Sequence, residues 1–304
     1  MVREEFALDE LDLVRMFEEC SNAGRWGVDD ELGTLNYITD EKRRSAAQLV
    51  REGRVIAIGQ PLSRLASATN VRPATHIMLL EQNPPLSAID YVGVAAHGFA
   101  VTHLDAVAHV FWEGKAYNKR RSEDVLSQAG LSFGSIHAQR QGIFTRGVLL
   151  DVAAARGAPW LEPDEFVTEA DLEQAELAQG TSVASGDALI VHTGLEARVA
   201  AHGPEDPSRR AGLDGGAVRW LHQREVAVYS GDCVERIPYP SKRVPLPLHQ
   251  IGLVSMGLCL LDCPTLTELV ALTRVLGRAD FLLTCAPIDV PGGTGVPVNP
   301  LCVF

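Results

Sequence analysis

The sequence has no long uninterrupted run of apolar residues and no excess of positive charge. No window of about 18 uncharged apolar residues occurs, so no membrane-spanning helix is predicted. The first residues, VREEFALDELDLVRMFEE, lack a basic segment followed by an apolar one, so no secretory signal is expected. Lys and Arg total 27 against 39 Asp and Glu, a formal net charge of −12. This balance argues against nucleic acid or an anionic membrane as a partner, and we expect a soluble cytoplasmic protein.

Disulfide frameworks and two common hydrolase motifs are also missing. The six cysteines include no CxxC pair, and we expect them to be reduced and to behave as small apolar side chains. Neither a GxSxG elbow nor an HExxH helix occurs. The sequence therefore gives no support for the hydrolase mechanisms that depend on these motifs. No repeat or Gly/Ser linker divides the chain. We therefore expect a single domain over residues 1–304, with a helical extension over about residues 1–50.

The apolar patterning predicts strands that alternate with helices. Buried strands are expected at residues 54–59, 187–194, 226–232, 257–262 and 280–290. Helices are expected at residues 5–19, 39–53, 168–180 and 217–225. Thr168 and Asp171 form a capping box at the start of one helix, and Leu8, Leu11 and Val14 have helical spacing in another. This alternation is typical of an α/β protein with a mixed or mostly parallel sheet and flanking helices.

Residues 97–114, HGFAVTHLDAVAHVFWEG, hold three of the nine histidines. Residues 92–106 are small, β-branched and apolar, which predicts a buried strand or its exit. On a strand, His103 and Asp105 face the same side, and His109 follows four residues later. A single histidine in an apolar run is more often a hydrogen-bonded core residue, but a buried carboxylate is costly unless it is paired or bound to metal. The stretch therefore predicts a divalent-metal site, with the role of His97 left open.

The same residues resemble the metal-dependent cyclase family, which includes bacterial kynurenine formamidases and isatin hydrolase. Its signature is HxGTHxDxxxH, and residues 102–109 read THLDAVAH. Further segments resemble its longer members in the same order: WGVDDELGTLN near the start, then YN, RGVLLDVA, GDALIVHTG and GGTGVPVNP. The resemblance covers nearly the whole chain and implies a cyclase-type swivelling β/β/α fold, found as a homodimer or homotetramer. The N-terminal helix of such proteins often packs on a partner subunit.

The resemblance also implies roles for individual residues. His103 and Asp105 correspond to metal ligands and His109 to the residue that transfers a proton. The downstream segment PLHQIGLVSMGLCLLD offers His249 and Asp262 to complete the metal site.

Two departures from the family pattern concern the number of metal ions. Phe99 and Val101 stand where the signature has His and Gly, and Asp262 stands where the formamidases have a longer Glu. These changes favour one metal ion, Zn²⁺ or Mn²⁺, over two.

A cation held by two imidazoles and a carboxylate can activate a water molecule and polarise a carbonyl group, while an imidazole such as His109 transfers a proton near neutral pH. This chemistry predicts a metal-dependent hydrolase of the amidohydrolase, formamidase or lactonase type, acting on a small cyclic or aromatic substrate. Phe99, Phe111, Trp112 and Trp26 are candidates for substrate contact, with core packing as the alternative. Two other functions stay open: a metal-dependent cyclase or dehydratase in natural-product or catabolic metabolism, and a relative that binds a ligand without turnover.

Overall fold

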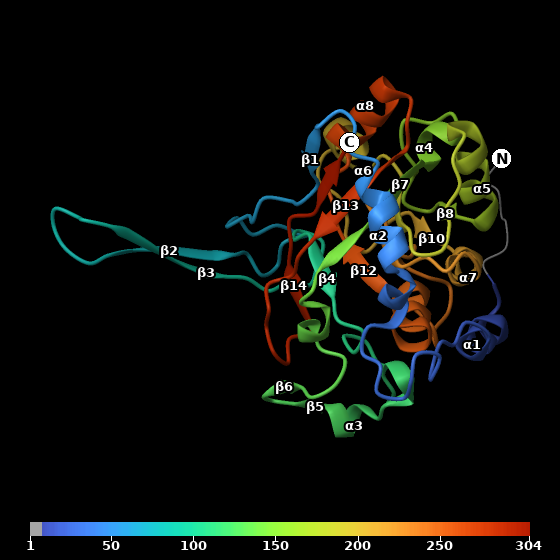
Figure 1. Ribbon diagram of the computed structural model, residues 1–304, viewed down its shortest axis with the longest axis horizontal. Coiled ribbons are helices and arrows are strands. Elements are labelled where there is room, and N and C mark those ends of the chain that lie inside the picture. Colours follow the sequence, from blue (N-terminus) through green and yellow to red (C-terminus); the bar gives the residue numbers. More distant parts are fainter. Residues whose placement is uncertain (1–7) are drawn as a thin grey trace.

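A nine-stranded mixed β-sheet forms the centre of the computed structural model, which describes residues 8–304 (Figure 1). Across the sheet the strands are β1 (Val55–Ala57), β15 (Leu301–Val303), β13 (Asp280–Cys285), β7 (Ile143–Asp151), β9 (Ala188–His192), β11 (Val228–Gly231), β12 (Cys259–Asp262), β4 (His103–Asp105) and β14 (Gly295–Pro297). The four neighbours β7, β9, β11 and β12 are parallel, and every other pairing is antiparallel. The mixed α/β class predicted from the sequence is therefore confirmed.

Both faces of the sheet are covered by apolar side chains. Successive residues of β9 alternate between two buried clusters, with Leu189 and Val191 in one and Ile190 in the other, as expected for a strand buried on both faces. The helices are α1 (Glu10–Glu19), α2 (Asp40–Ala47), α3 (Ser122–Val125), α4 (Val152–Ala155), α5 (Glu169–Gln179), α6 (Leu195–His202), α7 (Gly215–Gln223) and α8 (Thr267–Leu276). Shorter 3₁₀ turns are η1 (Gly33–Tyr37), η2 (Tyr117–Lys119) and η3 (Ile136–Gln139), and η4 (Leu248–Met256) is a π-helix. Among the helices of residues 8–304, none is long and apolar enough to cross a membrane.

The capped helices form where the sequence predicts them. In α5, Thr168 Oγ1 accepts a hydrogen bond from the Asp171 backbone N–H, the Asp171 side chain accepts one from the Thr168 N–H, and Gly180 ends the helix with φ +61°. Thr39, one of the two N-caps that the sequence allows beside Asp40, caps α2, but the helix ends at Ala47 rather than near Gly53. Residues 48–54 form the connection between α2 and β1 at the edge of the sheet.

Of the three apolar positions predicted at helical spacing around α1, Leu8 and Val14 are partly buried against a core cluster, and Leu11 is not. Leu13, Met16 and Phe17 are buried, whereas Leu11 is 63% exposed. The helix packs on η4 of the same chain, and its buried side chains belong to one of the two core clusters. Residues 5–7 of the predicted helix lie outside the described residues.

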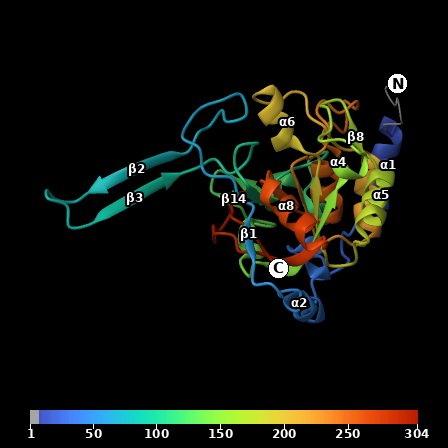
Figure 2. The same ribbon diagram turned by 90° about the horizontal axis from the view of Figure 1, so that it is seen from above.

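The stretch 92–106, predicted as a buried strand or its exit, contains a buried strand only at β4. Only β4 belongs to the sheet, and β3 (Ala88–Gly93) instead pairs with β2 (Thr75–Leu80) in a separate hairpin. Figures 1 and 2 show that this hairpin projects from the rest of the molecule. Gly98, with φ +125°, lies in the loop that joins the hairpin to β4. The small apolar residues of this stretch therefore line a loop and a short strand.

Two short strand pairs lie outside the main sheet. Strand β8 (Phe166–Val167) pairs in parallel with β10 (Gly212–Leu213), and β5 (Leu126–Ser127) pairs with the antiparallel β6 (Gly130–Leu131). All six cysteines are free and buried, and burial raises the pKa of the Cys20 thiol to about 11 and that of Cys285 to about 12. These thiols are therefore protonated at neutral pH and shielded from solvent, as small apolar side chains would be.

Candidate metal centre

The candidate metal centre is built on β4, which lies between β12 and β14 in the sheet. His103 and Asp105 are both buried, with exposed fractions of 3% and 0%. Asp262 on β12 lies directly opposite His103 in the antiparallel register. Opposite residues of an antiparallel pair point to the same side, so the register brings Asp262 to the side that carries His103 and Asp105.

Asp105 is the hub of this cluster. Its Oδ1 lies 3.0 Å from His97 Nδ1 and 3.5 Å from His103 Nε2, and its Oδ2 lies 3.9 Å from His249 Nε2. His249 Nε2 also lies 3.2 Å from Asp262 Oδ2. The structure thus places all four ligands expected from the sequence in one cluster, and Asp262 reaches it although its side chain is shorter than Glu.

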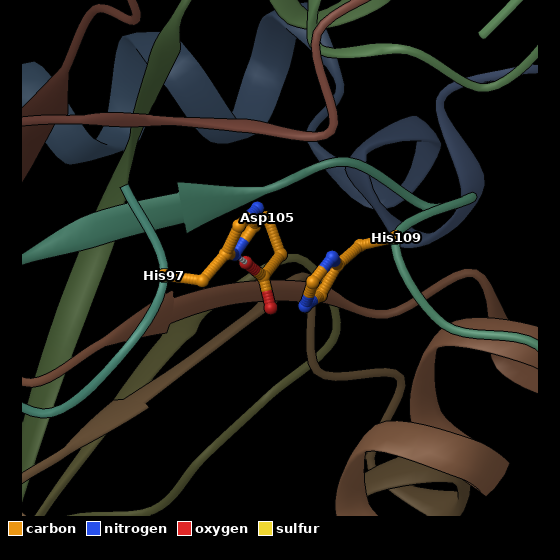
Figure 3. A group of neighbouring side chains, drawn as sticks. All are labelled: His97, Asp105 and His109. Atoms are coloured by element: carbon orange, nitrogen blue, oxygen red, sulfur yellow. Dashed lines mark ion pairs between the residues drawn. The ribbon is translucent and has the colours of Figure 1, made fainter. Parts of the chain in front are cut away.

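His97 and His109 complete the ring of imidazoles around Asp105 (Figure 3). Their rings are parallel and stacked, with centroids 3.7 Å apart and an interplanar angle of 1°. His97 Nε2 lies 3.0 Å from Thr294 Oγ1, in the GGTG segment. A Cβ on Gly295 would lie 2.6 Å from the His97 ring, so glycine is needed there for the ring to fit. His97, whose role the sequence left open, therefore belongs to the cluster, and it comes from the loop before β4.

The cluster has the properties of a cation site. Within residues 8–304, neither carboxylate oxygen of Asp105 nor Oδ1 of Asp262 accepts a hydrogen bond of ordinary geometry, although all three atoms are buried and His97 Nδ1 lies 3.0 Å from Asp105 Oδ1. Buried acceptors without donors are costly, and a bound cation would satisfy them. The ligand atoms of His103, Asp105 and Asp262 lie within 4.8 Å of one another, and so do those of His97, Asp105 and His109. Imidazole nitrogens and carboxylate oxygens of this kind fit a divalent ion such as Zn²⁺ or Mn²⁺.

Charge and burial act in opposite directions on these groups. Burial raises the pKa of Asp105, but the neighbouring histidines, His97 first, outweigh it and hold the pKa at about 2. Burial lowers the pKa of His109 to about 4, with the Asp105 carboxylate opposing the shift. Burial also lowers the pKa of His249, but Glu235 and Asp262 more than compensate and raise it well above its usual range. Asp105 is therefore an anion and His109 a neutral base at pH 7.

Glu235 is a further member of the site that the sequence did not reveal. It is fully buried, and its two carboxylate oxygens lie 2.9 and 3.0 Å from His249 Nδ1. A carboxylate in this position holds the ring so that the other nitrogen, Nε2, points to the metal ligands. The segment DCVERIPYP gives no sign of this role, because the contact depends on η4 folding back toward the end of β11.

The four aromatic candidates are largely held by contacts within the chain. Trp112 stacks on Phe17, with centroids 3.6 Å apart, and Trp26 packs edge-to-face on Tyr37 at 5.0 Å. Phe111 packs against one core cluster. Phe99 is partly buried, and the Arg210 guanidinium carbon lies 4.0 Å from its ring centroid. The packing alternative therefore accounts for the contacts of Trp112 and Trp26.

Two of the other segments that resemble the family, WGVDDELGTLN and YN, contact each other away from the metal ligands. Tyr117 Oη donates a hydrogen bond of 3.0 Å to Asp30 Oδ2, and Asn118 Nδ2 donates to the backbone oxygens of Gly27 and Asp30. Asn118 has φ +57°, a conformation that Asn tolerates better than most residues. The WGVDDELGTLN and YN segments thus form one structural unit that fixes the chain after His109.

The fold and this cluster of imidazoles and carboxylates define a cyclase-type protein, and the sequence agrees. The model of the Cyclase family matches residues 44–235, which is more than half of the chain. The chain therefore belongs to the Cyclase family. Comparison with curated proteins finds no significant match.

Several solved structures share the fold. A novel cyclase is 28% identical, with a TM-score of 0.83, over 93% of this chain and 99% of the other. An isatin hydrolase bound to the product analogue thioisatinate is 18% identical, with a TM-score of 0.58, over 88% of this chain and 99% of the other. A predicted metal-dependent hydrolase from Bacillus stearothermophilus is 12% identical, with a TM-score of 0.52, over 82% and 97%. These comparisons show that the chain has the fold of the Cyclase family.

Proposed function

We propose that this chain is a metal-dependent hydrolase that opens or cleaves an amide, imide or lactone bond in a small cyclic or aromatic substrate. The observation that carries the proposal is the buried Asp105 carboxylate, which has four imidazoles around it and accepts no hydrogen bond of ordinary geometry within residues 8–304. The isatin hydrolase and the predicted metal-dependent hydrolase with this fold support the same reaction type.

The residues that would hold a single Zn²⁺ or Mn²⁺ ion are His103, Asp105, His249 and Asp262. When bound, such an ion acts as a Lewis acid on a carbonyl group and lowers the pKa of a water molecule. Glu235 accepts the Nδ1 hydrogen of His249 and thereby fixes the tautomer that presents Nε2 to the ion. Phe99 offers an apolar surface near this loop for a ring of the substrate.

His109 moves the proton in this scheme. Its low pKa leaves the imidazole neutral at pH 7, so it can take a proton from the attacking water. Stacking on His97 limits rotation of the ring, which keeps His109 in place. The protonated imidazole beside the Asp105 carboxylate then returns the proton to the leaving nitrogen or oxygen.

Metal content tests the proposal directly. We expect the purified protein to hold about one equivalent of Zn²⁺ or Mn²⁺ by elemental mass spectrometry, and hydrolysis of a cyclic imide or lactone panel to stop with chelator and return with metal. His103→Ala should lose the metal. His137→Ala is the matched control, because His137 is half-exposed and pairs with Asp289 at 2.6 Å. Turnover that persists without metal, or a His103→Ala protein that keeps it, would contradict the proposal.

A metal-dependent cyclase or dehydratase is the second candidate, favoured by the family that the chain matches. Only hydrolysis must place an oxygen atom from solvent in the product. Turnover in water enriched in ¹⁸O, followed by mass spectrometry of the product, therefore separates the two reactions.

A further inference from the structure

We propose that Arg210 is a positioning residue of the metal centre, and that it acts through the ring of Phe99. Phe99 lies in the loop between His97 and β4, the strand that carries His103 and Asp105. It stands where the family signature has His. The inference rests on the metal binding in the proposed function, and it does not depend on which bond the enzyme cleaves.

Arg210 is fixed by its backbone and by one carboxylate. Its N–H donates to Ile237 O and its carbonyl oxygen accepts from Ile237 N–H, at 2.9 Å in each case. Its Nε lies 2.5 Å from Glu205 Oε1, and the two side chains are only 5% and 10% exposed. Ile237 is two residues after Glu235, whose carboxylate holds the ring of His249. Arg210 is therefore anchored to the segment that supports His249.

The guanidinium of Arg210 covers one face of the Phe99 ring. Its Cζ lies 4.0 Å from the ring centroid, the shortest such distance in the part of the chain that the structure describes. The attraction between a cation and an aromatic face is stronger where water is excluded. Nη1 of Arg210 is buried and has no hydrogen-bond acceptor of ordinary geometry within residues 8–304. Hydrogen bonds alone therefore do not hold this end of the side chain, and the aromatic ring is its partner.

The backbone around Phe99 is tied to the end of β12. Gln60 Nε2 donates to Phe99 O at 3.2 Å and to Cys263 O at 2.7 Å. Thr102 Oγ1 also donates to Cys263 O, at 2.6 Å. Cys263 directly follows Asp262 at the end of the strand. A shift of the loop at Phe99 would therefore disturb the surroundings of Asp262 as well.

Side chains hold this loop at only some of its residues. Gly98 is exposed and has φ +125°, and a Cβ at this position would meet no atom within 4 Å. The ring of His97 is held by Thr294, with Nε2 3.0 Å from Oγ1. Side-chain packing therefore restrains the loop at Phe99 and at His97, but not at the residue between them. Without the contact at Phe99, we expect His97 to lose its position in the metal cluster.

Arg210 thus connects two parts of the metal centre that are far apart in sequence. Its backbone belongs with the segment that supports His249, and its guanidinium holds the loop that supplies His97. The contact also limits the role of Phe99 in substrate binding. Because Arg210 covers one face of the ring, a substrate can use only the opposite face or the edge.

Cobalt binding tests this role, because the visible absorption of bound Co²⁺ depends on the number and arrangement of its ligands. Phe99→Leu removes the aromatic face but leaves Arg210 paired with Glu205. We expect this variant to change the visible spectrum and to raise the Kd for Co²⁺ by about 10- to 100-fold, as for other residues that support ligands. Phe99→Tyr keeps the aromatic face and should bind Co²⁺ with the affinity and the spectrum of the wild type.

Arg278→Met is the matched control. The guanidinium of Arg278 also lies between an aromatic ring and a carboxylate, with Cζ 5.4 Å from the Phe304 centroid and Nη2 3.0 Å from Glu52 Oε2. Its side chain is only 15% exposed. This variant should leave the affinity and the spectrum unchanged, since neither partner belongs to the metal cluster.

A second variant tests whether Arg210 acts through Phe99. Arg210→Met together with Glu205→Gln removes both charges of the buried pair, so no carboxylate is left without a partner. It should weaken Co²⁺ binding as Phe99→Leu does, and adding Phe99→Leu to it should have little further effect. A wild-type chain that binds no Co²⁺ would overturn the proposed function together with this inference. Wild-type binding with an unchanged Kd and spectrum in Phe99→Leu, or additive effects of the two changes, would overturn this inference alone.

Discussion

His109 can be separated from the metal ligands by one substitution. The side chain stacks on His97 and faces Asp105, and we expect His109→Gln to keep the metal but to lose turnover by about 10²- to 10⁴-fold, the usual contribution of a general base. Elemental analysis and kcat measured on the same preparation check both parts. Loss of the metal together with activity would make His109 a ligand and refute the assigned role.

The pKa of His109 predicts the acidic limb of the rate profile. Because burial holds this pKa at about 4, the imidazole stays unprotonated as the pH falls from 8 to 5, and it becomes protonated only near pH 4. We expect no loss of kcat with an apparent pKa near 6.5 from this residue. A pH–rate profile with saturating metal measures this. A single-proton limb near 6.5 that disappears in His109→Gln would contradict the expectation.

At the residue scale, the sequence predicts which side chains of the site lie together when those residues are close in sequence. His103 and Asp105 are two apart on one strand, so strand geometry alone brings them to one side. His97 could not be placed in the same way, because its position depends on a loop and on contact with Thr294. Glu235 gave no signal at all, since its contact with His249 depends on two elements that only the tertiary fold brings together.

At the scale of elements, the contact between β14 and β4 sets the position of His97. A methyl group on Gly295 would lie 2.6 Å from the His97 ring and 2.8 Å from Leu104 O. We therefore expect Gly295→Ala to displace the ring and weaken metal binding by about 10- to 100-fold, the range typical of residues that support ligands. Competition with a chromogenic chelator measures the affinity.

Gly216→Ala provides the comparison. Gly216 lies in the first turn of α7, where an added Cβ meets only the Asp214 side chain at 3.4 Å. This variant should bind metal as the wild type does. Equal metal affinities for the wild type, Gly295→Ala and Gly216→Ala would show that the position of His97 does not matter for metal binding.

The bounds of an element were predictable where residues within the same segment set them. They were not predictable where pairing with distant segments sets them. The capping box of α5 and its terminal Gly180 lie within one segment, so the sequence places both ends. The extent of β4 and the separate β2–β3 hairpin depend on which strands pair, and the apolar run over residues 92–106 does not encode this. The exposure of Leu11 on α1 could not be predicted for a similar reason, because contact with η4 determines which side of the helix is covered.

At the scale of the whole molecule, one ion network joins three elements. Asp151 at the end of β7 contacts His192 Nδ1 on β9 at 2.8 Å and Arg274 Nη2 on α8 at 2.7 Å. Burial opposes ionisation of Asp151, but His192 and Arg274 outweigh it and lower its pKa from 3.8 to about 2. Burial likewise opposes the charge on His192, and Asp151 raises its pKa above 6.5.

These shifts define the pH range in which the network stabilises the fold. The contribution of Asp151 is complete above its unfolded pKa of 3.8 and is lost as the pH falls toward 2. The contribution of His192 is complete below 6.5 and is lost as the pH rises through its raised folded pKa. We expect Asp151→Asn to lower the free energy of unfolding by about 2 kcal/mol at pH 5.5, and by much less at pH 2.5.

Urea unfolding at the two pH values measures this difference. Asp289→Asn is the control, because Asp289 pairs with His137 where both side chains are about half exposed, and such pairs contribute about 0–1 kcal/mol. If the difference in free energy of unfolding between wild type and Asp151→Asn is the same at pH 5.5 and pH 2.5, the carboxylate charge is not the source of that difference.

The order of the ligands along the chain has a consequence for biosynthesis. His103 and Asp105 emerge from the ribosome well before His249 and Asp262, and β4 gains its neighbours only when residues 259–262 and 295–297 have been made. During most of translation the early histidines therefore have no partner strand to fix them. We therefore expect stable metal binding only after nearly all of these residues have been synthesised.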